Sequence, residues 1–155
     1  NIQLFICGER LKSDHDDSME EEILCLKNKF PDRVIWPGYV QNTNFAYKAM
    51  DICCLPSYRE GMPMTILEAM MTGIPVLATD IRGSREVVIN NKTGLICKPK
   101  DKFDFRNKLE QLIVNPELRN ELGSNAYKRA RKFFTQEKSL ETEIKLFEKI
   151  KGNIK

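Results

Sequence analysis

The chain has 155 residues and a mass of 18.0 kDa, of which 41% are apolar and 30% are charged. This composition is typical of a globular protein with one hydrophobic core, and it excludes disordered and collagen-like chains. The longest apolar stretches, such as 74–78, are far shorter than the ~20 residues that a membrane-spanning helix needs. The net charge of +3 is too small to indicate nucleic acid as a partner.

Short apolar runs alternate with helical patterns over the first two thirds of the chain. Residues 1–7 read as a strand rather than a signal peptide, so we expect a cytoplasmic protein. Strands are predicted at 2–7, 34–36, 51–55, 75–79 and 94–97. Helices are predicted between them at 18–30, 42–50, 63–73 and 84–89. Strands that are apolar on both faces and separated by helices indicate a parallel sheet covered on both sides, which is a doubly wound, Rossmann-like α/β fold.

The pattern becomes wholly helical after Pro99. Helices are predicted at 101–114, 116–133 and 136–150. Asp101 is a suitable N-cap for the first of them, and Pro116 suits the first turn of the second. Thr135 can cap the third. We therefore expect one domain over residues 1–155, without internal repeats or a long linker.

The charge is unevenly distributed along the chain. Residues 1–97 carry a net charge of −3 and residues 98–155 a net charge of +6. The excess is greatest in a basic cluster at Lys128, Arg129, Arg131 and Lys132. One interpretation is a solvated helix C-terminus, where cations are favourable to the helix dipole. The other is a patch that contacts an anionic membrane surface, at the inner face of the membrane, or a phosphate-bearing acceptor.

The cysteine pattern favours a reducing compartment. The five cysteines form no C-x-x-C pair, which argues against a zinc site or a disulfide framework. Four of them lie in apolar strand-like runs, where a free thiol behaves as a small hydrophobic side chain: Cys7, Cys53, Cys54 and Cys97. The single histidine, His15, lies in a polar stretch and makes cysteine-histidine catalysis improbable.

Ligands of open α/β sheets bind at the carboxyl ends of the strands, which directs attention to the loop at 56–63. Pro63 is predicted as the first residue of the following helix, because proline has no N–H to leave unsatisfied there. The free N–H groups near 64–66, together with the helix dipole, would then form an anion site. Gly61 would let the backbone approach a ligand closely.

Two carboxylates flank this predicted anion site. Glu60 lies in the loop, and helical phase places Glu68 outside the apolar arc that contains Ile66, Leu67 and Met70. A carboxylate beside an anion site is unfavourable unless it binds another group, and ionised carboxylates pair well with sugar hydroxyl donors. A diphosphate with a sugar at each end is the shape of a nucleotide sugar, which we therefore predict as the ligand.

The motifs around this loop resemble the donor-binding half of retaining GT-B fold glycosyltransferases of the family 4 type. The matching residues are Pro56, Ser57, Glu60, Gly61, Leu67 to Met70, Gly73, Pro75, Val76, Ala78 to Asp80, Gly83 and Glu86. Further matches are Trp36 to Val40, Ala49 to Ile52, Asn91 to Leu95 and Phe134 to Glu137. Arg59 and Pro63 further resemble the bacterial members that build capsular and other surface polysaccharides.

The resemblance implies a role for each matching residue. Glu60 would be the catalytic residue and would bind hydroxyls of the transferred sugar, while Glu68 would bind the ribose. Backbone groups of Gly61, Met62, Pro63, Met64 and Thr65 would contact the sugar and the diphosphate. The loop of Gly38, Tyr39 and Val40 would hold the base. The reaction implied is metal-independent transfer of a hexose or N-acetylhexosamine from an NDP-sugar, UDP-linked by expectation, with retention at the anomeric carbon.

The resemblance also implies parts outside the chain. The N-terminal acceptor domain, for a glycan or lipid-linked acceptor, and the opening strand of the donor domain are not found in this sequence, so we expect the isolated fragment to be inactive. Two alternatives remain open at this point: a non-catalytic nucleotide-binding module and a sugar-nucleotide epimerase-like domain. Asp14-His15-Asp16 superficially matches a metal-binding D-x-D motif, but its polar surroundings favour a solvated loop. Arg10 could contact phosphate.

Overall fold

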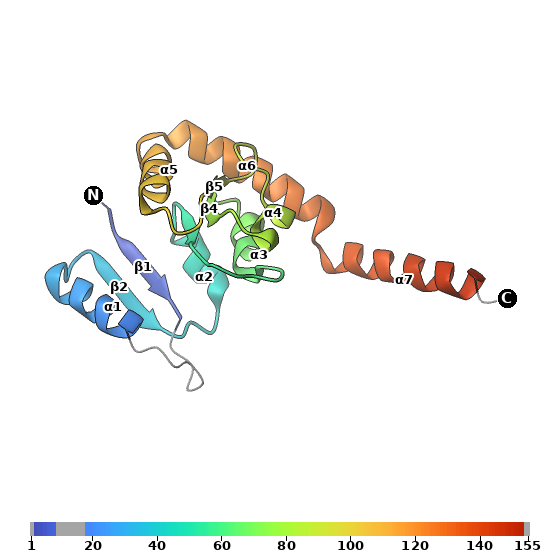
Figure 1. The fold of residues 1–155 in the computed structure, drawn as a ribbon, viewed down its shortest axis with the longest axis horizontal. Helices are drawn as coiled ribbons and strands as arrows, with labels where there is room; N and C mark the ends of the chain where they lie inside the picture. The colour runs from blue at the N-terminus through green and yellow to red at the C-terminus, as the bar shows by residue number, and fades with distance from the viewer. Residues whose placement is uncertain (1, 9–17, 154–155) are drawn as a thin grey trace. The chain divides into compact units, whose positions relative to one another are not determined.

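The computed structural model describes residues 2–8 and 18–153, with strands and helices alternating up to β5 and only helices after it (Figure 1). The chain forms two compact units, Asn1–Met50 and Asp51–Lys155. The assignment of residues 1–155 to one nucleotide-sugar-binding domain remains a prediction.

The first unit contains β1 (Leu4–Cys7), α1 (Ser18–Lys29), β2 (Val34–Gly38) and α2 (Thr43–Lys48). β1 pairs with β2 in parallel, with Leu4 opposite Val34. The indole N–H of Trp36 donates to the carbonyl of Gly8 at 2.9 Å, which holds the two strand ends together. The strands are more exposed than their apolar sequences predict, because Val34 is the one buried residue of either strand.

The second unit is built on the parallel three-stranded sheet of β3 (Cys53–Leu55), β4 (Val76–Thr79) and β5 (Leu95–Cys97), in that order. Cys53 is opposite Val76, and Leu77 is opposite Leu95. Every residue of β4 and β5 is buried. The parallel pairing is as predicted, and β4 and β5 are covered on both faces, since strands exposed on one face show alternating burial.

Within the described residues, the second unit also contains five helices, which Figure 1 labels. They are α3 (Met64–Met71), α4 (Arg82–Val87), α5 (Lys102–Val114), α6 (Pro116–Phe133) and α7 (Gln136–Asn153). α3 packs against β3 and β4, α5 packs against β4 and β5, and α6 packs against α3 and α5. The core between the sheet and helices α5 and α6 contains Leu77, Leu95, Cys97, Leu112 and Leu122.

α4 begins at residue 82, two residues earlier than predicted. Its N-cap is Ile81, in an extended conformation, and no side chain caps the first turn. The helix starts because the N–H of Arg85 donates to the carbonyl of Ile81 at 3.1 Å. A helix without a capping side chain leaves no start signal in the sequence, which explains the error.

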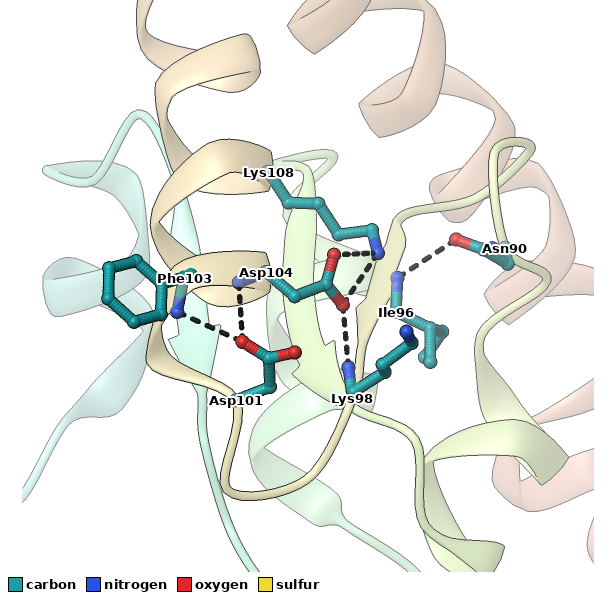
Figure 2. A network of polar contacts seen from close by, with 7 residues as sticks. All are labelled: Asn90, Ile96, Lys98, Asp101, Phe103, Asp104 and Lys108. Carbon is teal, nitrogen blue, oxygen red and sulfur yellow. Dashed lines mark hydrogen bonds and ion pairs between the residues drawn. The ribbon is translucent and has the colours of Figure 1, made fainter.

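The junction between β5 and α5 confirms the predicted cap. The carboxylate of Asp101 accepts from the N–H groups of Phe103 and Asp104 at 3.1 and 3.0 Å (Figure 2). The carboxylate of Asp104 in turn accepts from the N–H of Lys98 at 2.7 Å and pairs with the ammonium of Lys108 at 2.7 Å. The first turn of α5 is therefore tied to the end of the strand that precedes it.

The basic cluster of α6 contains residues with two different roles. Lys128, Arg131 and Lys132 are exposed, and the last two lie in the final turn, as the helix-dipole interpretation requires. Arg129 is half-buried, and it donates to the carbonyls of Val87 and Glu86 at 2.8 and 3.0 Å. Arg129 therefore links α6 to the end of α4, a role that neither sequence interpretation included.

α7 follows α6 as a separate, exposed helix (Figure 1). The hydroxyl of Thr135 accepts from the N–H of Lys138 at 3.4 Å, which confirms Thr135 as the cap. The helix continues to Asn153, three residues past its predicted end at 150. None of the helices in the described part of the chain is both long and apolar enough to cross a membrane.

All five cysteines, each within the described residues, are free thiols. Cys53 and Cys97 are buried, as predicted. Cys7 and Cys54 are exposed, although they lie in strands as predicted. Successive residues of a strand point to opposite faces, and in β3 the packed face is that of Cys53.

Candidate functional site

The N-terminus of α3 presents unpaired backbone donors. Pro63 is the N-cap, with φ −75° and ψ 94°, rather than the first helical residue that the sequence predicts. Its carbonyl accepts from the N–H of Ile66 at 3.0 Å and from that of Leu67 at 3.2 Å. The predicted set of free donors at 64–66 therefore loses Ile66. Among the described residues, the N–H groups of Met64 and Thr65 have no recorded partner.

Helix α3 buries one side and leaves the predicted polar edge accessible. Ile66, Leu67 and Met70 are buried, whereas Met64 and Thr65 are exposed and Glu68 is half-buried. Pro63 is fully buried and fixes the start of the helix against the core. The helix phase that the sequence predicts is confirmed.

Gly61 lies in the loop before α3, and the protein's own structure imposes no need for glycine there. Its φ is not in the left-handed region. A Cβ built on it would meet no atom of the described residues within 4 Å. Space beside an exposed backbone is what the close approach of a ligand requires, as the sequence analysis expects.

A pocket of about 560 Å³ lies beside this loop. It is lined by Glu60, Gly61, Met62, Arg82, Glu86 and Phe134. The structure thus brings three predicted site residues together with two residues of α4 and the first residue after α6. Glu60 is half-buried, so the residue is partly shielded from water while it still lines the pocket.

Arg82 is a pocket residue that the sequence analysis did not assign to the site. The neighbouring Arg85 is paired with Asp80 at 2.8 Å, whereas no ion pair of Arg82 is recorded among the described residues. Arg82 gives the pocket a cation beside its two carboxylates, Glu60 and Glu86. Arg82 lies four residues before Glu86, so on one helix the two side chains would lie on the same face, and this spacing could have identified Arg82. The predicted start of α4 at residue 84 left Arg82 outside the helix.

The remaining predicted residues lie elsewhere or outside the described chain. Gly38, Tyr39 and Val40 belong to the first unit, where Gly38 has φ +76° and Tyr39 is 68% exposed. Their contact with the base stays a prediction. The Asp14-His15-Asp16 motif and Arg10 lie outside the described residues. Within residues 2–8 and 18–153, no three histidine, cysteine or acidic side chains gather as a metal site would need.

Comparison with known proteins identifies the family. The family model for glycosyl transferases group 1 matches residues 1–129. The chain belongs to this family. The glycosyltransferase family that the sequence resembles is thereby confirmed, while the retaining mechanism stays a prediction. Similarity to a solved structure confirms the predicted doubly wound fold.

The chain is also similar to individual known proteins, one by sequence and two by structure. The capsular polysaccharide biosynthesis glycosyltransferase CapM of Staphylococcus aureus is 27% identical over 137 residues, which are 88% of this chain and 35% of CapM. Sucrose-phosphate synthase of Thermosynechococcus elongatus is 27% identical with a TM-score of 0.83, over 97% of this chain and 39% of that one. Anabaena Alr3699/HepE in complex with UDP-glucose is 23% identical with a TM-score of 0.75, over 84% and 36%. The chain therefore spans little more than a third of the length of each of these proteins.

Proposed function

We propose that this chain is the donor-binding part of a retaining glycosyltransferase, which transfers a hexose or N-acetylhexosamine from a UDP-sugar to a glycan or lipid-linked acceptor. The observation that carries the proposal is the N-terminus of α3, where the N–H groups of Met64 and Thr65 have no partner among the described residues, beside the half-buried Glu60. The UDP-glucose held by the Anabaena protein supports a UDP-linked donor, and CapM supports a role in surface polysaccharide synthesis.

The roles proposed for the residues follow from their chemistry. The N–H groups of Met64 and Thr65, at the positive end of the dipole of α3, bind the diphosphate. Glu60 accepts hydrogen bonds from the sugar, and Glu68 accepts them from the ribose. The role proposed for the loop of Gly38, Tyr39 and Val40 is contact with the base.

The same groups account for catalysis of the transfer. As the bond to the anomeric carbon breaks, negative charge grows on the departing diphosphate, where the α3 donors stabilise it. The carboxylate of Glu60 stabilises the positive charge that develops on the sugar ring. The acceptor is bound by a further part of the protein, at the inner face of the membrane. No divalent metal takes part in this scheme.

Calorimetry with UDP and UDP-glucose tests the site. We expect Glu60→Ala to weaken UDP-glucose binding about tenfold or more and to leave UDP binding nearly unchanged, because a hydrogen bond to a charged group is lost only at the sugar. Glu68→Ala should weaken both ligands by a similar factor. Glu121→Ala, on an exposed position of α6, is the matched control and should change neither affinity.

Unchanged affinities in both site variants would remove the assignment of Glu60 and Glu68. The same titrations repeated in EDTA test the metal independence. We expect the wild-type affinities to stay the same, and a strict requirement for Mg²⁺ or Mn²⁺ would instead favour the Asp14 and Asp16 interpretation.

A further inference from the structure

The start of α4 lies directly against the backbone of the loop that carries Glu60. A Cβ built on Gly83 would lie 2.5 Å from the carbonyl oxygen of Gly61 and 2.7 Å from that of Glu60. Real Cβ atoms essentially never approach other atoms this closely. Because both neighbours are backbone atoms, no side-chain rotation can relieve the contact. Gly83 is buried and its φ is not in the left-handed region, so close approach is what requires glycine here.

The same loop is held at a second point by β4. The hydroxyl of Thr79, the last residue of β4, donates to the carbonyl of Ser57. Thr79 is 3% exposed. The loop is thus supported at Ser57 by the strand and at Glu60 and Gly61 by the helix that follows this strand.

Thr79 and Gly83, which make these two contacts, lie in a segment that is itself bonded to neighbouring elements. The N–H of Asp80 donates to the carbonyl of Cys97 at 2.7 Å, which joins this segment to the end of β5. The guanidinium of Arg85 donates to the carboxylate of Asp80 at 2.8 Å and to its carbonyl at 3.2 Å. Thr79 and Gly83 therefore connect the loop that carries Glu60 to the three-stranded sheet.

From these contacts we propose that Thr79 and Gly83 are positioning residues that set the place of Glu60 relative to the N-terminus of α3. The inference rests on the proposed function, because it assigns Glu60 to the transferred sugar. The donors of Met64 and Thr65 are held separately, through Pro63 and the buried side of α3. A displaced loop therefore disturbs the sugar end of the donor and leaves the diphosphate end in place.

Gly83→Ala forces the loop backbone away from α4. A displacement of about 1 Å would break the hydrogen bond between the carboxylate of Glu60 and a sugar hydroxyl, and loss of a hydrogen bond to a charged group costs about tenfold or more in affinity. We therefore expect the affinity of the 155-residue chain for UDP-glucose to fall about tenfold or more, while its affinity for UDP changes by less than about threefold. If UDP-N-acetylglucosamine is the tighter ligand of the wild type, it replaces UDP-glucose in the comparison.

Gly123→Ala is the matched control for loss of stability. A Cβ at Gly123 would overlap the carbonyl oxygen of Gly73, at the other end of α3 from Glu60. Both variants should therefore lower the unfolding temperature. Only Gly83→Ala should change the ratio of UDP-glucose affinity to UDP affinity, which a merely structural role would not move.

Thr79→Val and Thr79→Ser supply an independent pair. The valine removes the hydroxyl that bonds to Ser57, and the serine retains it, so the affinity ratio should change in Thr79→Val and be restored in Thr79→Ser. If Gly83→Ala fails to fold, these two Thr79 variants still test the positioning role.

The outcomes separate the two proposals. A wild-type chain that binds neither UDP nor a UDP-sugar overturns the proposed function and the positioning role together. A wild-type chain that binds both, with the same affinity ratio in Gly83→Ala and in Thr79→Val, overturns the positioning role alone.

Discussion

The hydroxyls of Ser84 and Thr93 are both buried but differ in what they bond to. The hydroxyl of Thr93 accepts from the N–H of Ile89 at 2.9 Å. The hydroxyl of Ser84, in a fully buried residue, has no partner among the described residues. An unpaired buried hydroxyl costs free energy, whereas removal of a paired one leaves its partner unsatisfied.

Ser84→Ala and Thr93→Val should therefore change stability in different directions. We expect Ser84→Ala to leave the free energy of unfolding unchanged or to raise it, because a buried polar atom without a partner is removed. Thr93→Val should lower it by about 1–3 kcal/mol, because the N–H of Ile89 loses its acceptor. Denaturant unfolding measures both values, and a large loss in Ser84→Ala would show that its hydroxyl is bonded.

At the scale of elements, the link between β5 and α5 depends on one ionised side chain. The pKa of Asp104 is lowered by the hydrogen bond from Lys108 and then by the backbone N–H of Lys98. A depressed folded-state pKa contributes stability above the unfolded value of 3.8, and this stability is lost as the pH falls through the folded pKa. The junction in Figure 2 should therefore weaken in acid.

Asp104→Asn tests this link through its pH dependence. At pH 7 the variant should be less stable by about 1 kcal/mol, a modest value because water partly screens the pair. The difference from wild type should shrink as the pH is lowered below about 4, since the wild-type carboxylate then becomes neutral. Thermal unfolding between pH 3 and 7 gives both curves. Glu141→Gln, which breaks an exposed ion pair with Lys138 on α7, is the control and should show a smaller effect.

At the scale of the whole molecule, burial is concentrated in the second unit. Every residue of β4 and β5 is buried, whereas no residue of β1 is. Local opening needs little free energy where few apolar side chains are buried, so the two sheets should differ in stability.

Hydrogen exchange on the intact chain measures this difference. We expect the amides of 76–79 and 95–97 to exchange most slowly, at a rate set by global unfolding. Amides of 4–7 and 34–38 should exchange earlier, although they also lie in a paired sheet. Equal protection in the two sheets would mean that the two units unfold as one cooperative structure.

Much of this architecture is readable from short-range signals. Asp101 caps α5 through residues two and three positions ahead of it, and Pro116 starts α6 directly after the capping Asn115. The apolar runs of β4 and β5 predict buried parallel strands because both faces are covered by helices. Glu68 is placed correctly because helical phase depends only on spacing.

The predictions that were wrong concern contacts that the spacing of residues in the sequence does not determine. Pro63 became an N-cap because its carbonyl accepts two helical hydrogen bonds, and α4 starts at Arg82 without a capping side chain. Arg82 consequently entered the pocket unpredicted. Packing also decides that Cys54 is exposed although its neighbours are apolar, because only one face of β3 is packed at that point.

The sequence by itself determined the element order, the parallel α/β fold and the family, because these depend on residue periodicity and on motifs within a few positions of one another. Only the tertiary structure decided that Thr79 and Gly83 support the Glu60 loop and that Arg129 joins α6 to α4. These contacts join residues about 20 to 40 positions apart, and their distances are set by how the sheet and helices pack rather than by any local preference.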